Sequence, residues 1–246
     1  MTPATFPTVR RVATWVVAAA FAVYMIRQAR KPHGWLGRYL LRGMNLSHSP
    51  LTDWGLKGVE IAKDATILDV GCGGGRTLQK LAARTTGKLF GVDFSKASVA
   101  ATRATNARAV ADGRLEVRHA SVSQLPFDDA TFDLVTAVET HYYWPDLARD
   151  LAEVRRVLKP GGTAVLIAEV YRHPGSAIES FALKLMSGVT LSPEQHRAAL
   201  EAAGFGEVRV ETRGGWIRAI GRNPSRVAGF PPAGAHGHFV AAGSPR

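Results

Sequence analysis

Short apolar runs alternate with longer segments of helical spacing along most of the chain between residues 61 and 203. Continuous apolar runs of this length are typical of strands that are buried on both faces of a parallel sheet. Two further runs, 208–211 and 216–220, lie close together and predict an antiparallel hairpin. The pattern therefore predicts an α/β fold: a doubly wound sheet, mostly parallel with an antiparallel last strand. The predicted strands are 67–70, 88–95, 115–119, 134–138 and 163–169, and the predicted helices are 77–83, 96–111, 147–158 and 192–203.

The first predicted strand runs directly into a loop of residues 71–75 that reads Gly-Cys-Gly-Gly-Gly. Glycine tolerates positive φ angles and lets a ligand approach the backbone closely. Free N–H groups in such a loop, followed by a helix N-terminus, favour a negative or electron-rich group. Strand, glycine loop and helix together predict nucleotide-type binding. A dinucleotide site needs Gly-x-Gly-x-x-Gly, whereas these glycines follow Asp69 with a different spacing, so a dehydrogenase is the weaker interpretation.

The second predicted strand ends in an acid, Asp93, which follows Gly71 by 22 residues. A carboxylate at this place can accept hydrogen bonds from both hydroxyl groups of a ribose, and such charge-assisted bonds are strong. Ser95 then has the residue type of an N-cap for the helix that begins at Lys96. The first two strands therefore predict a nucleoside site at the carboxyl edge of the sheet.

The loop at 71–75 resembles motif I of the class I S-adenosylmethionine (SAM)-dependent methyltransferases of the methyltransferase type 11-like group. The segments 120–127, ASVSQLPF, and 151–169, LAEVRRVLKPGGTAVLIAE, carry the same resemblance, which spans residues 61–222. It implies a Rossmann-like fold with SAM as cofactor. Ser121 stands where the family has an acid that binds the adenine amino group. The implied cofactor contacts are Asp69, Gly71, Cys72, Gly73, Gly75, Asp93, Phe94, Ser121, Val122 and Glu139.

The segment after the fourth predicted strand contains the candidate catalytic side chains. SAM carries an activated methyl group, so transfer requires an in-line approach and exclusion of water. Ligands of open α/β sheets bind at the carboxyl ends of the strands, which puts Glu139, His141 and Tyr142 beside the methyl donor. His141 could act as a general base, and Tyr142 or Tyr143 could face the sulfonium. The alternative is that His141 is a polar surface residue and that Tyr143 and Trp144 pack against the next helix.

Two functions follow from the resemblance. The first is a SAM-dependent methyltransferase acting on a small-molecule or lipid-like acceptor. The second is a SAM-binding protein of the same fold without turnover, which rests on Ser121 and on the lack of a certain base. The sequence contains no zinc-ligand cluster, so no metal is expected. Its single cysteine, Cys72, excludes an intrachain disulfide and favours a reducing compartment.

Positive charge is concentrated at the two ends of the chain. The formal net charge is +11. Residues 1–42 contain seven Lys or Arg residues and no acid, and residues 221–246 add three Arg and no acid, so that the middle of the chain is nearly neutral. This distribution favours contact with an anionic membrane surface over a nucleic-acid groove, and no nucleic-acid partner is expected.

Residues 12–26, VATWVVAAAFAVYMI, form an apolar segment with basic residues on both sides. It is interpreted as a membrane anchor, as a helix buried in the protein or a dimer, or as a signal peptide. As a helix it would be about 22 Å long, short of the ~30 Å hydrocarbon core. Basic residues rather than a polar cleavage region follow it, which disfavours a signal peptide. Membrane attachment would keep the domain at the cytoplasmic face of a membrane, with a cytoplasmic protein as the alternative.

These features divide the chain into three parts: an N-terminal helix and capping connector (1–60), a SAM-binding domain (61–222) and a disordered tail (223–246). The connector resembles segments that cap the active site in small-molecule methyltransferases. Within it, His48 either takes part in the site or does not, and Trp54 either caps the site or packs at the edge of the domain. The sequence indicates neither the oligomeric state nor the methyl acceptor.

Overall fold

A computed structural model describes residues 31–177 and 188–225, together with the single positions Val17, Phe21, Tyr24, Gln28, Ser180, Phe181 and Lys184. The apolar segment predicted at 12–26 and the tail predicted at 223–246 therefore lie largely outside the described residues. Among the helices that the structure does describe, none is both long enough and apolar enough to cross a bilayer.

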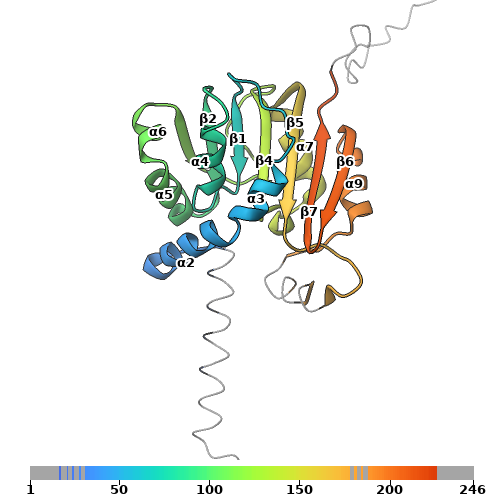
Figure 1. The fold of residues 1–246 in the computed structure, drawn as a ribbon, viewed down its shortest axis with the longest axis horizontal. Helices are drawn as coiled ribbons and strands as arrows, with labels where there is room; N and C mark the ends of the chain where they lie inside the picture. The colour runs from blue at the N-terminus through green and yellow to red at the C-terminus, as the bar shows by residue number, and fades with distance from the viewer. Residues whose placement is uncertain are drawn as a thin grey trace, which may run out of the picture.

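In this part of the chain, seven strands form one sheet in the order β3-β2-β1-β4-β5-β7-β6 (Figure 1). Neighbouring strands from β3 to β5 pair in parallel, whereas β7 is antiparallel to both β5 and β6. This arrangement confirms the predicted Rossmann-like sheet, mostly parallel with an antiparallel end. The strands are β1 (Ile67–Val70), β2 (Leu89–Asp93), β3 (Leu115–His119), β4 (Phe132–Val138), β5 (Leu158–Ala168), β6 (Gly206–Arg213) and β7 (Trp216–Arg222).

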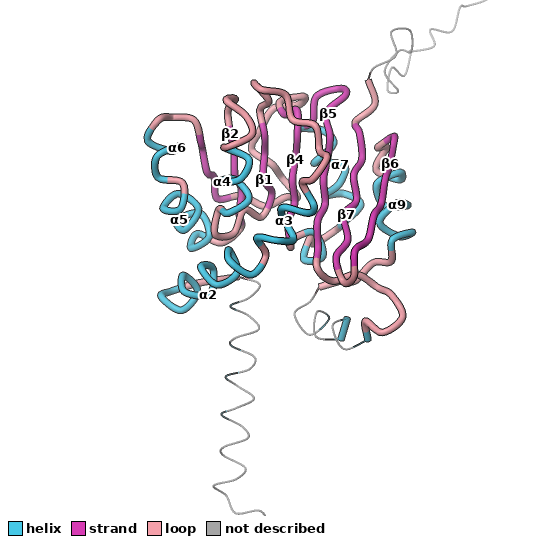
Figure 2. Tube along the Cα trace, viewed as in Figure 1, coloured by secondary structure: helices cyan, strands magenta, loops and turns pink. Residues whose placement is uncertain are grey.

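Helices cover both faces of the sheet (Figure 2). They are α2 (Gly34–Ser47), α3 (Ser49–Gly55), α4 (Arg76–Ala82), α5 (Lys96–Thr105), α6 (Ala107–Ala111), the 3-10 turn η1 (His141–Tyr143), α7 (Leu147–Val157) and α9 (Pro193–Ala202). Consecutive residues of β1 point into different apolar layers, because Ile67 packs with residues of α3, α4 and α5 and Leu68 packs with residues of α7 and α9. Burial on both faces explains why the parallel strands are continuously apolar.

Most elements lie within two residues of their predicted bounds, but two differ by more, in each case through a side-chain or backbone contact with a distant segment. The predicted helix 96–111 is divided at Asn106, whose side-chain amide donates to the carbonyl oxygens of Thr102 and Gly75 at 3.0 Å each. Such side-chain bonds compete with helical backbone bonding. The strand predicted at 163–169 begins earlier, at Leu158, because Gly161 and Gly162 exchange backbone hydrogen bonds with Asn223.

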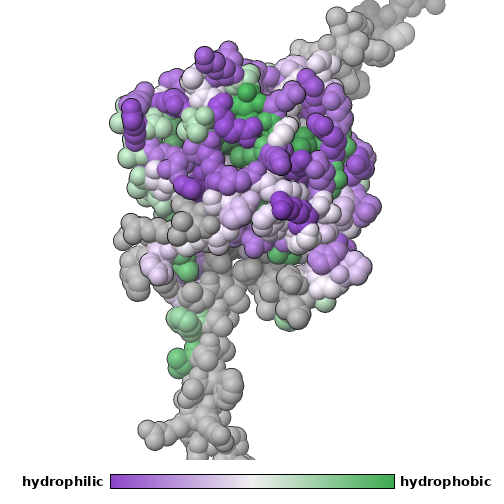
Figure 3. Space-filling view, in the orientation of Figure 1, coloured by the Kyte–Doolittle hydropathy of each residue, from purple (hydrophilic) through white to green (hydrophobic). Residues whose placement is uncertain are grey.

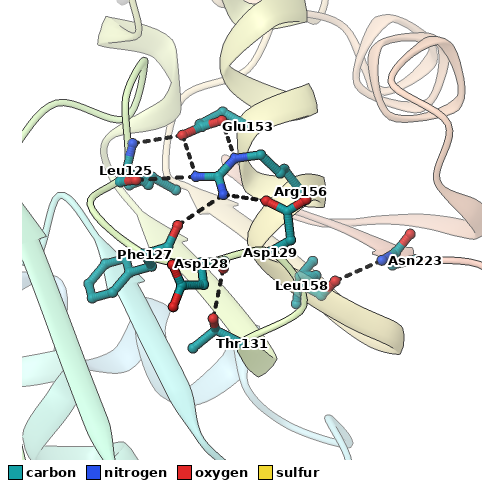
Figure 4. A network of polar contacts seen from close by, with 9 residues as sticks. All are labelled: Leu125, Phe127, Asp128, Asp129, Thr131, Glu153, Arg156, Leu158 and Asn223. Carbon is teal, nitrogen blue, oxygen red and sulfur yellow. Dashed lines mark hydrogen bonds and ion pairs between the residues drawn. The ribbon is translucent and has the colours of Figure 1, made fainter. Parts of the chain in front are cut away.

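Arg156 on α7 fixes the loop that follows β3 (Figure 4). Its guanidinium donates to the carbonyl oxygens of Phe127 and Leu125 and to the carboxylates of Asp129 and Glu153. Glu153 in turn accepts the N–H of Leu125 at 2.8 Å. Hydrogen bonding to the two carboxylates raises the pKa of Arg156, so the guanidinium stays charged. The network anchors the far end of the loop whose first residues enter the candidate site.

Candidate SAM-binding site at the carboxyl edge of the sheet

Two cavities lie at the carboxyl edge of the parallel strands, and Gly71 lines both. The first cavity, of about 250 Å³, lies beside the ends of β1 and β2; its lining is Val70, Gly71, Val92, Asp93, Phe94, Ala120, Ser121, Val122, Thr140, Tyr143, Trp144 and Pro145. The second cavity, of about 80 Å³, lies between the glycine loop and α2 and α3; its lining is Leu41, His48, Thr52, Gly71, Cys72, Gly73, Gly74, Arg76, Thr77, Val138 and Glu139. The shared glycine makes the two cavities neighbouring parts of one site.

Most of the predicted cofactor contacts lie in these linings. They are Gly71, Cys72, Gly73, Asp93, Phe94, Ser121, Val122 and Glu139. Asp69 and Gly75 line neither cavity. Asp69 is buried in β1 and accepts a hydrogen bond from Thr136 Oγ1 at 2.6 Å, and burial raises its pKa to about 7. Its observed contact is therefore with the neighbouring strand β4.

Three glycines of the loop have positive φ angles: +72° at Gly71, +52° at Gly73 and +84° at Gly75. A Cβ on Gly71 would lie 2.2 Å from Thr140 Oγ1, and one on Gly75 would lie 2.6 Å from Asn106 Nδ2. At Gly73 the nearest atom would be 3.9 Å away. Gly71 and Gly75 are thus required by packing within the protein, whereas Gly73 leaves open space at the wall of the second cavity.

The acid at the end of β2 is held by the glycine loop. Asp93 accepts the N–H of Gly73 at 2.9 Å and the N–H of Ser95 at 2.8 Å. Burial raises the pKa of the Asp93 carboxyl, and these two N–H donors lower it. Ser95 is also the N-cap of α5, since its side chain accepts from the N–H of Ser98. The carboxylate retains lone pairs that can accept hydroxyl groups from a ligand in the first cavity.

Cys72 is buried within the loop, and Thr102 Oγ1 lies 3.4 Å from its sulfur. Burial raises the pKa of the Cys72 thiol well above its usual value. A protonated, buried thiol is unreactive. Cys72 therefore fills the loop, and its place beside Thr102 helps to fix the glycine backbone against α5.

Glu139, directly after β4, reaches the second cavity through an unusual backbone conformation. Its φ of +58° lies in the left-handed region, which costs a non-glycine residue free energy and is common at functional sites. Its carboxylate accepts a hydrogen bond from Tyr142 Oη at 2.7 Å and another from the N–H of Glu169. Burial raises the pKa of Glu139 to about 7. The predicted pair Glu139 and Tyr142 is thus brought together by the structure.

The structure places His141 away from both cavities, contrary to the predicted position beside the methyl donor. Its side chain is buried, and its Nε2 lies 3.0 Å from Nε2 of His196 on α9. The turn η1 directs the ring into the protein, and burial together with His196 holds the pKa of His141 well below its usual range. A neutral, enclosed imidazole without access to the cavities does not fit the role of general base.

Three side chains in or beside the second cavity were missed or left undecided by the sequence analysis. His48 Nε2 lies 3.3 Å from Glu169 Oε2, and the nearest donor and acceptor atoms of His48, Glu139 and Glu169 all lie within 4.8 Å of one another. Arg76 lines the cavity, and its buried Nε has no hydrogen-bond partner among the described residues. The sequence offers one signal for Arg76, which is a basic residue directly after a glycine loop. For Glu169 the only signal is its position at the end of a predicted strand.

Comparison with known proteins agrees with this arrangement. Residues 68–166 match the family model described as a methyltransferase domain. The chain is 31% identical over 146 residues to an O-methyltransferase from Penicillium expansum, covering 58% of this chain and 53% of that protein. It is 38% identical over 99 residues to 24-methylenesterol C-methyltransferase 2 from Oryza sativa subsp. japonica, covering 40% of this chain and 27% of that protein. The chain thus spans about half of the first relative and a smaller part of the second.

Solved structures share the fold. A SAM-dependent methyltransferase from Aquifex aeolicus superposes with a TM-score of 0.62 at 22% identity, covering 75% of this chain and 97% of that protein. At this identity the likeness concerns the fold alone.

Proposed function

We propose that this chain, a member of the class I SAM-dependent methyltransferase family, transfers the methyl group of SAM to a small lipid-like acceptor at a membrane surface. SAM is the cofactor of this family, and when bound it supplies a methyl group on a positively charged sulfur. The observation that carries the membrane part of the proposal is a rim of exposed apolar side chains at the same edge of the sheet as the two cavities.

The residues of the site fit SAM. In the first cavity, Asp93 can accept the ribose hydroxyls and Ser121 can bond to the adenine rim. In the second cavity, the open space at Gly73 admits the methionine part of SAM against the loop backbone. The unpartnered Nε of Arg76 is a donor for the methionine carboxylate, since buried donors require a partner. These residues bind and orient the donor, while the methyl transfer itself needs only alignment.

The rim consists of three exposed apolar side chains on segments that adjoin the site. Tyr39 is 71% exposed on α2, the helix that also supplies Leu41 to the second cavity. Val189 is 59% exposed, and its N–H donates to the carbonyl oxygen of Tyr142. Phe94, which lines the first cavity, is also exposed. An apolar rim next to a ligand site is typical of a surface that contacts a membrane or an apolar partner.

Apolar side chains are also exposed at described positions N-terminal to α2. Val17 and Phe21 are helical and exposed, and in the space-filling view hydrophobic residues are visible below a domain face that is largely hydrophilic (Figure 3). The seven basic residues among positions 1–42, with no acid, would add attraction to anionic lipid. The sterol methyltransferase among the relatives is named for a lipid acceptor, which also supports a lipid-like substrate.

Co-sedimentation with vesicles tests the membrane part. The full chain is expected to sediment with vesicles of phosphatidylcholine and phosphatidylglycerol, and less with phosphatidylcholine alone. Phe21→Glu and Lys31→Glu should weaken this binding several-fold, because they remove apolar area and basic charge at the edge. Arg108→Glu, on α6 at the opposite edge of the sheet, makes the same charge change and is expected to have no effect (Figure 1).

Incubation of the full chain with radiolabelled SAM and a total lipid extract tests turnover. Label in the organic phase is the expected result. A protein that binds SAM but transfers no label would support the alternative, a SAM-binding protein without turnover.

One result of the sedimentation experiment would contradict the membrane part. If the full chain stays in the supernatant with every vesicle while a variant beginning at Lys31 fails to fold, the apolar segment is a structural helix, and the membrane part is wrong.

A further inference from the structure

We propose that His48 is the general base of this site, held by Glu169, and that the methyl acceptor is therefore a hydroxyl compound that must lose a proton. This inference rests on the proposed function and names its substrate class. It follows from the geometry of two residues that lie far apart in the sequence and meet beside the second cavity. Neither the family match, which ends at residue 166, nor the predicted catalytic residues include this pair.

The position of His48 is fixed by the backbone around it. His48 is the residue between α2 and α3, and its carbonyl oxygen accepts both the N–H and the Oγ1 hydroxyl of Thr52, at 3.0 Å and 2.9 Å. Both His48 and Thr52 line the second cavity. The imidazole therefore borders the cavity next to the glycine loop, where the methyl donor is expected.

The contact with Glu169 defines the proton-bearing nitrogen of His48. Nε2 lies 3.3 Å from Glu169 Oε2, and an ionised carboxylate can only accept a hydrogen bond. Nε2 therefore carries the hydrogen, and Nδ1 is left with a lone pair that can take a proton from an acceptor. A carboxylate that orients an imidazole and stabilises its charged form is the usual partner of a histidine base.

The remaining groups near His48 support a neutral imidazole at rest. Burial lowers the pKa of His48, and the Glu169 carboxylate raises it. Glu139 comes from the end of β4, and Arg76 on α4 lines the same cavity. Both oxygens of Glu139 already accept hydrogen bonds, from Tyr142 and from the N–H of Glu169. Glu139 is thus fixed in place beside Glu169, and the His48 lone pair is the more available acceptor of a proton.

The chemical step balances with these groups. The acceptor oxygen attacks the methyl carbon, an O–C bond forms, and the C–S bond breaks with its electron pair passing to sulfur. The hydroxyl proton moves to Nδ1 of His48. The positive charge thus passes from the sulfonium to an imidazolium beside Glu169, whose carboxylate compensates it. The Glu169 side chain is 44% exposed and that of His48 24%, so the proton can then leave to solvent.

A series of phenols of different acidity separates a base from a structural residue. Single-turnover methylation of para-methoxyphenol, para-chlorophenol and para-nitrophenol is measured with the full-length wild type and with His48→Asn. The variant should lose roughly 10²–10⁴-fold in rate with para-methoxyphenol, as expected for loss of a general base. It should lose only a few-fold with para-nitrophenol, because a large fraction of this phenol is already ionised near neutral pH and that fraction needs no base. SAM affinity should change less than threefold.

A pH profile tests Glu169 as the positioning residue. The rate with para-methoxyphenol should rise with pH as His48 loses its proton. Glu169→Gln should shift this rise to lower pH, because the carboxylate that stabilises the imidazolium is gone, and should lower the plateau. His173→Asn is the matched control: His173 is exposed, its ring contacts Tyr171, and it lines neither cavity. This variant should leave both the rates and the profile unchanged.

Three outcomes would overturn the inference. One is an equal loss for all three phenols in His48→Asn. Another is a wild type that binds SAM but methylates none of the phenols, which would leave the family assignment intact. The third is a rate abolished by EDTA and restored by Mg²⁺ or Zn²⁺, because His48, Glu139 and Glu169 would then serve as metal ligands. Failure of the wild type to bind SAM at all would instead contradict the proposed function, and this inference with it.

Discussion

The carboxylate of Asp93 accepts the backbone N–H of Gly73 at 2.9 Å and so joins the end of β2 to the glycine loop. The first cavity is lined by Asp93 and the second by Gly73. This bond therefore couples the two parts of the candidate site. It also orients the carboxylate before any ligand arrives, which lowers the entropy lost on binding.

Replacement of Asp93 should weaken binding at the ribose. Asp93→Ala is expected to reduce SAM affinity by more than 1 kcal/mol, on the scale of roughly 1.5–3 kcal/mol for hydrogen bonds to charged groups. Because the ribose is common to both ligands, 5′-methylthioadenosine should lose affinity by a similar factor. Isothermal titration measures both, with Asp112→Ala at an exposed position as control. Unchanged affinity in the Asp93 variant would mean that SAM binds elsewhere.

Ser121 lines the first cavity, and its Oγ accepts the N–H of Ser123 at 3.2 Å. An aspartate can keep this bond and still offer a charged acceptor to the adenine amino group. Ser121→Asp should therefore bind SAM as tightly as the wild type or more tightly, with the protein folded as judged by circular dichroism. Loss of SAM binding by a folded variant would show that Ser121 has a different contact.

Arg76 should distinguish ligands by their methionine part. Its unpartnered Nε borders the second cavity, where it can donate to the carboxylate of the amino-acid group. Arg76→Gln should weaken binding of S-adenosylhomocysteine roughly ten-fold or more, as for loss of a charged hydrogen bond, and leave 5′-methylthioadenosine nearly unaffected. Competition binding of the two ligands measures the ratio. Equal weakening of both would mean that the variant disturbs the loop rather than one contact.

The buried pair His141 and His196 should make stability depend on pH. Burial lowers the pKa of both groups, and their Nε2 atoms lie 3.0 Å apart. The unfolded chain regains an ordinary histidine pKa near 6.5 and binds more protons below it, so stability is lost as pH falls below that value, by at most about 1.4 kcal/mol per pH unit for each histidine. Stability from this pair is fully present above about pH 7.

Urea unfolding of the wild type and His141→Phe between about pH 7.5 and pH 5 checks this effect. The difference between the two proteins is the relevant quantity, because Asp69 and Glu139, whose pKa values are raised to about 7, act with the opposite sign in the same range. The difference should shift in favour of the variant as pH falls. His173→Phe, at an exposed position, is the control. A difference that is constant with pH would contradict the prediction.

The sequence by itself determined the strands of the sheet and the place of the glycine loop beside Asp93. The apolar pattern of a strand is a local property of the chain, and a glycine loop followed by an acid at the end of the next strand predicts that Gly71, Gly73 and Asp93 lie close together. For the same reason, most predicted cofactor contacts do line the two cavities.

Only the tertiary structure decided which titratable side chains face the cavities. The segment after β4 contains Glu139, His141 and Tyr142 within four residues. The left-handed φ of Glu139 directs its side chain toward the second cavity, whereas the 3-10 turn that follows directs His141 into the core. The partner of His141 is His196, 55 residues away, and the partner of His48 is Glu169 at the end of β5. Such pairings depend on helix packing and strand ends that meet in space, which no local pattern of residues encodes.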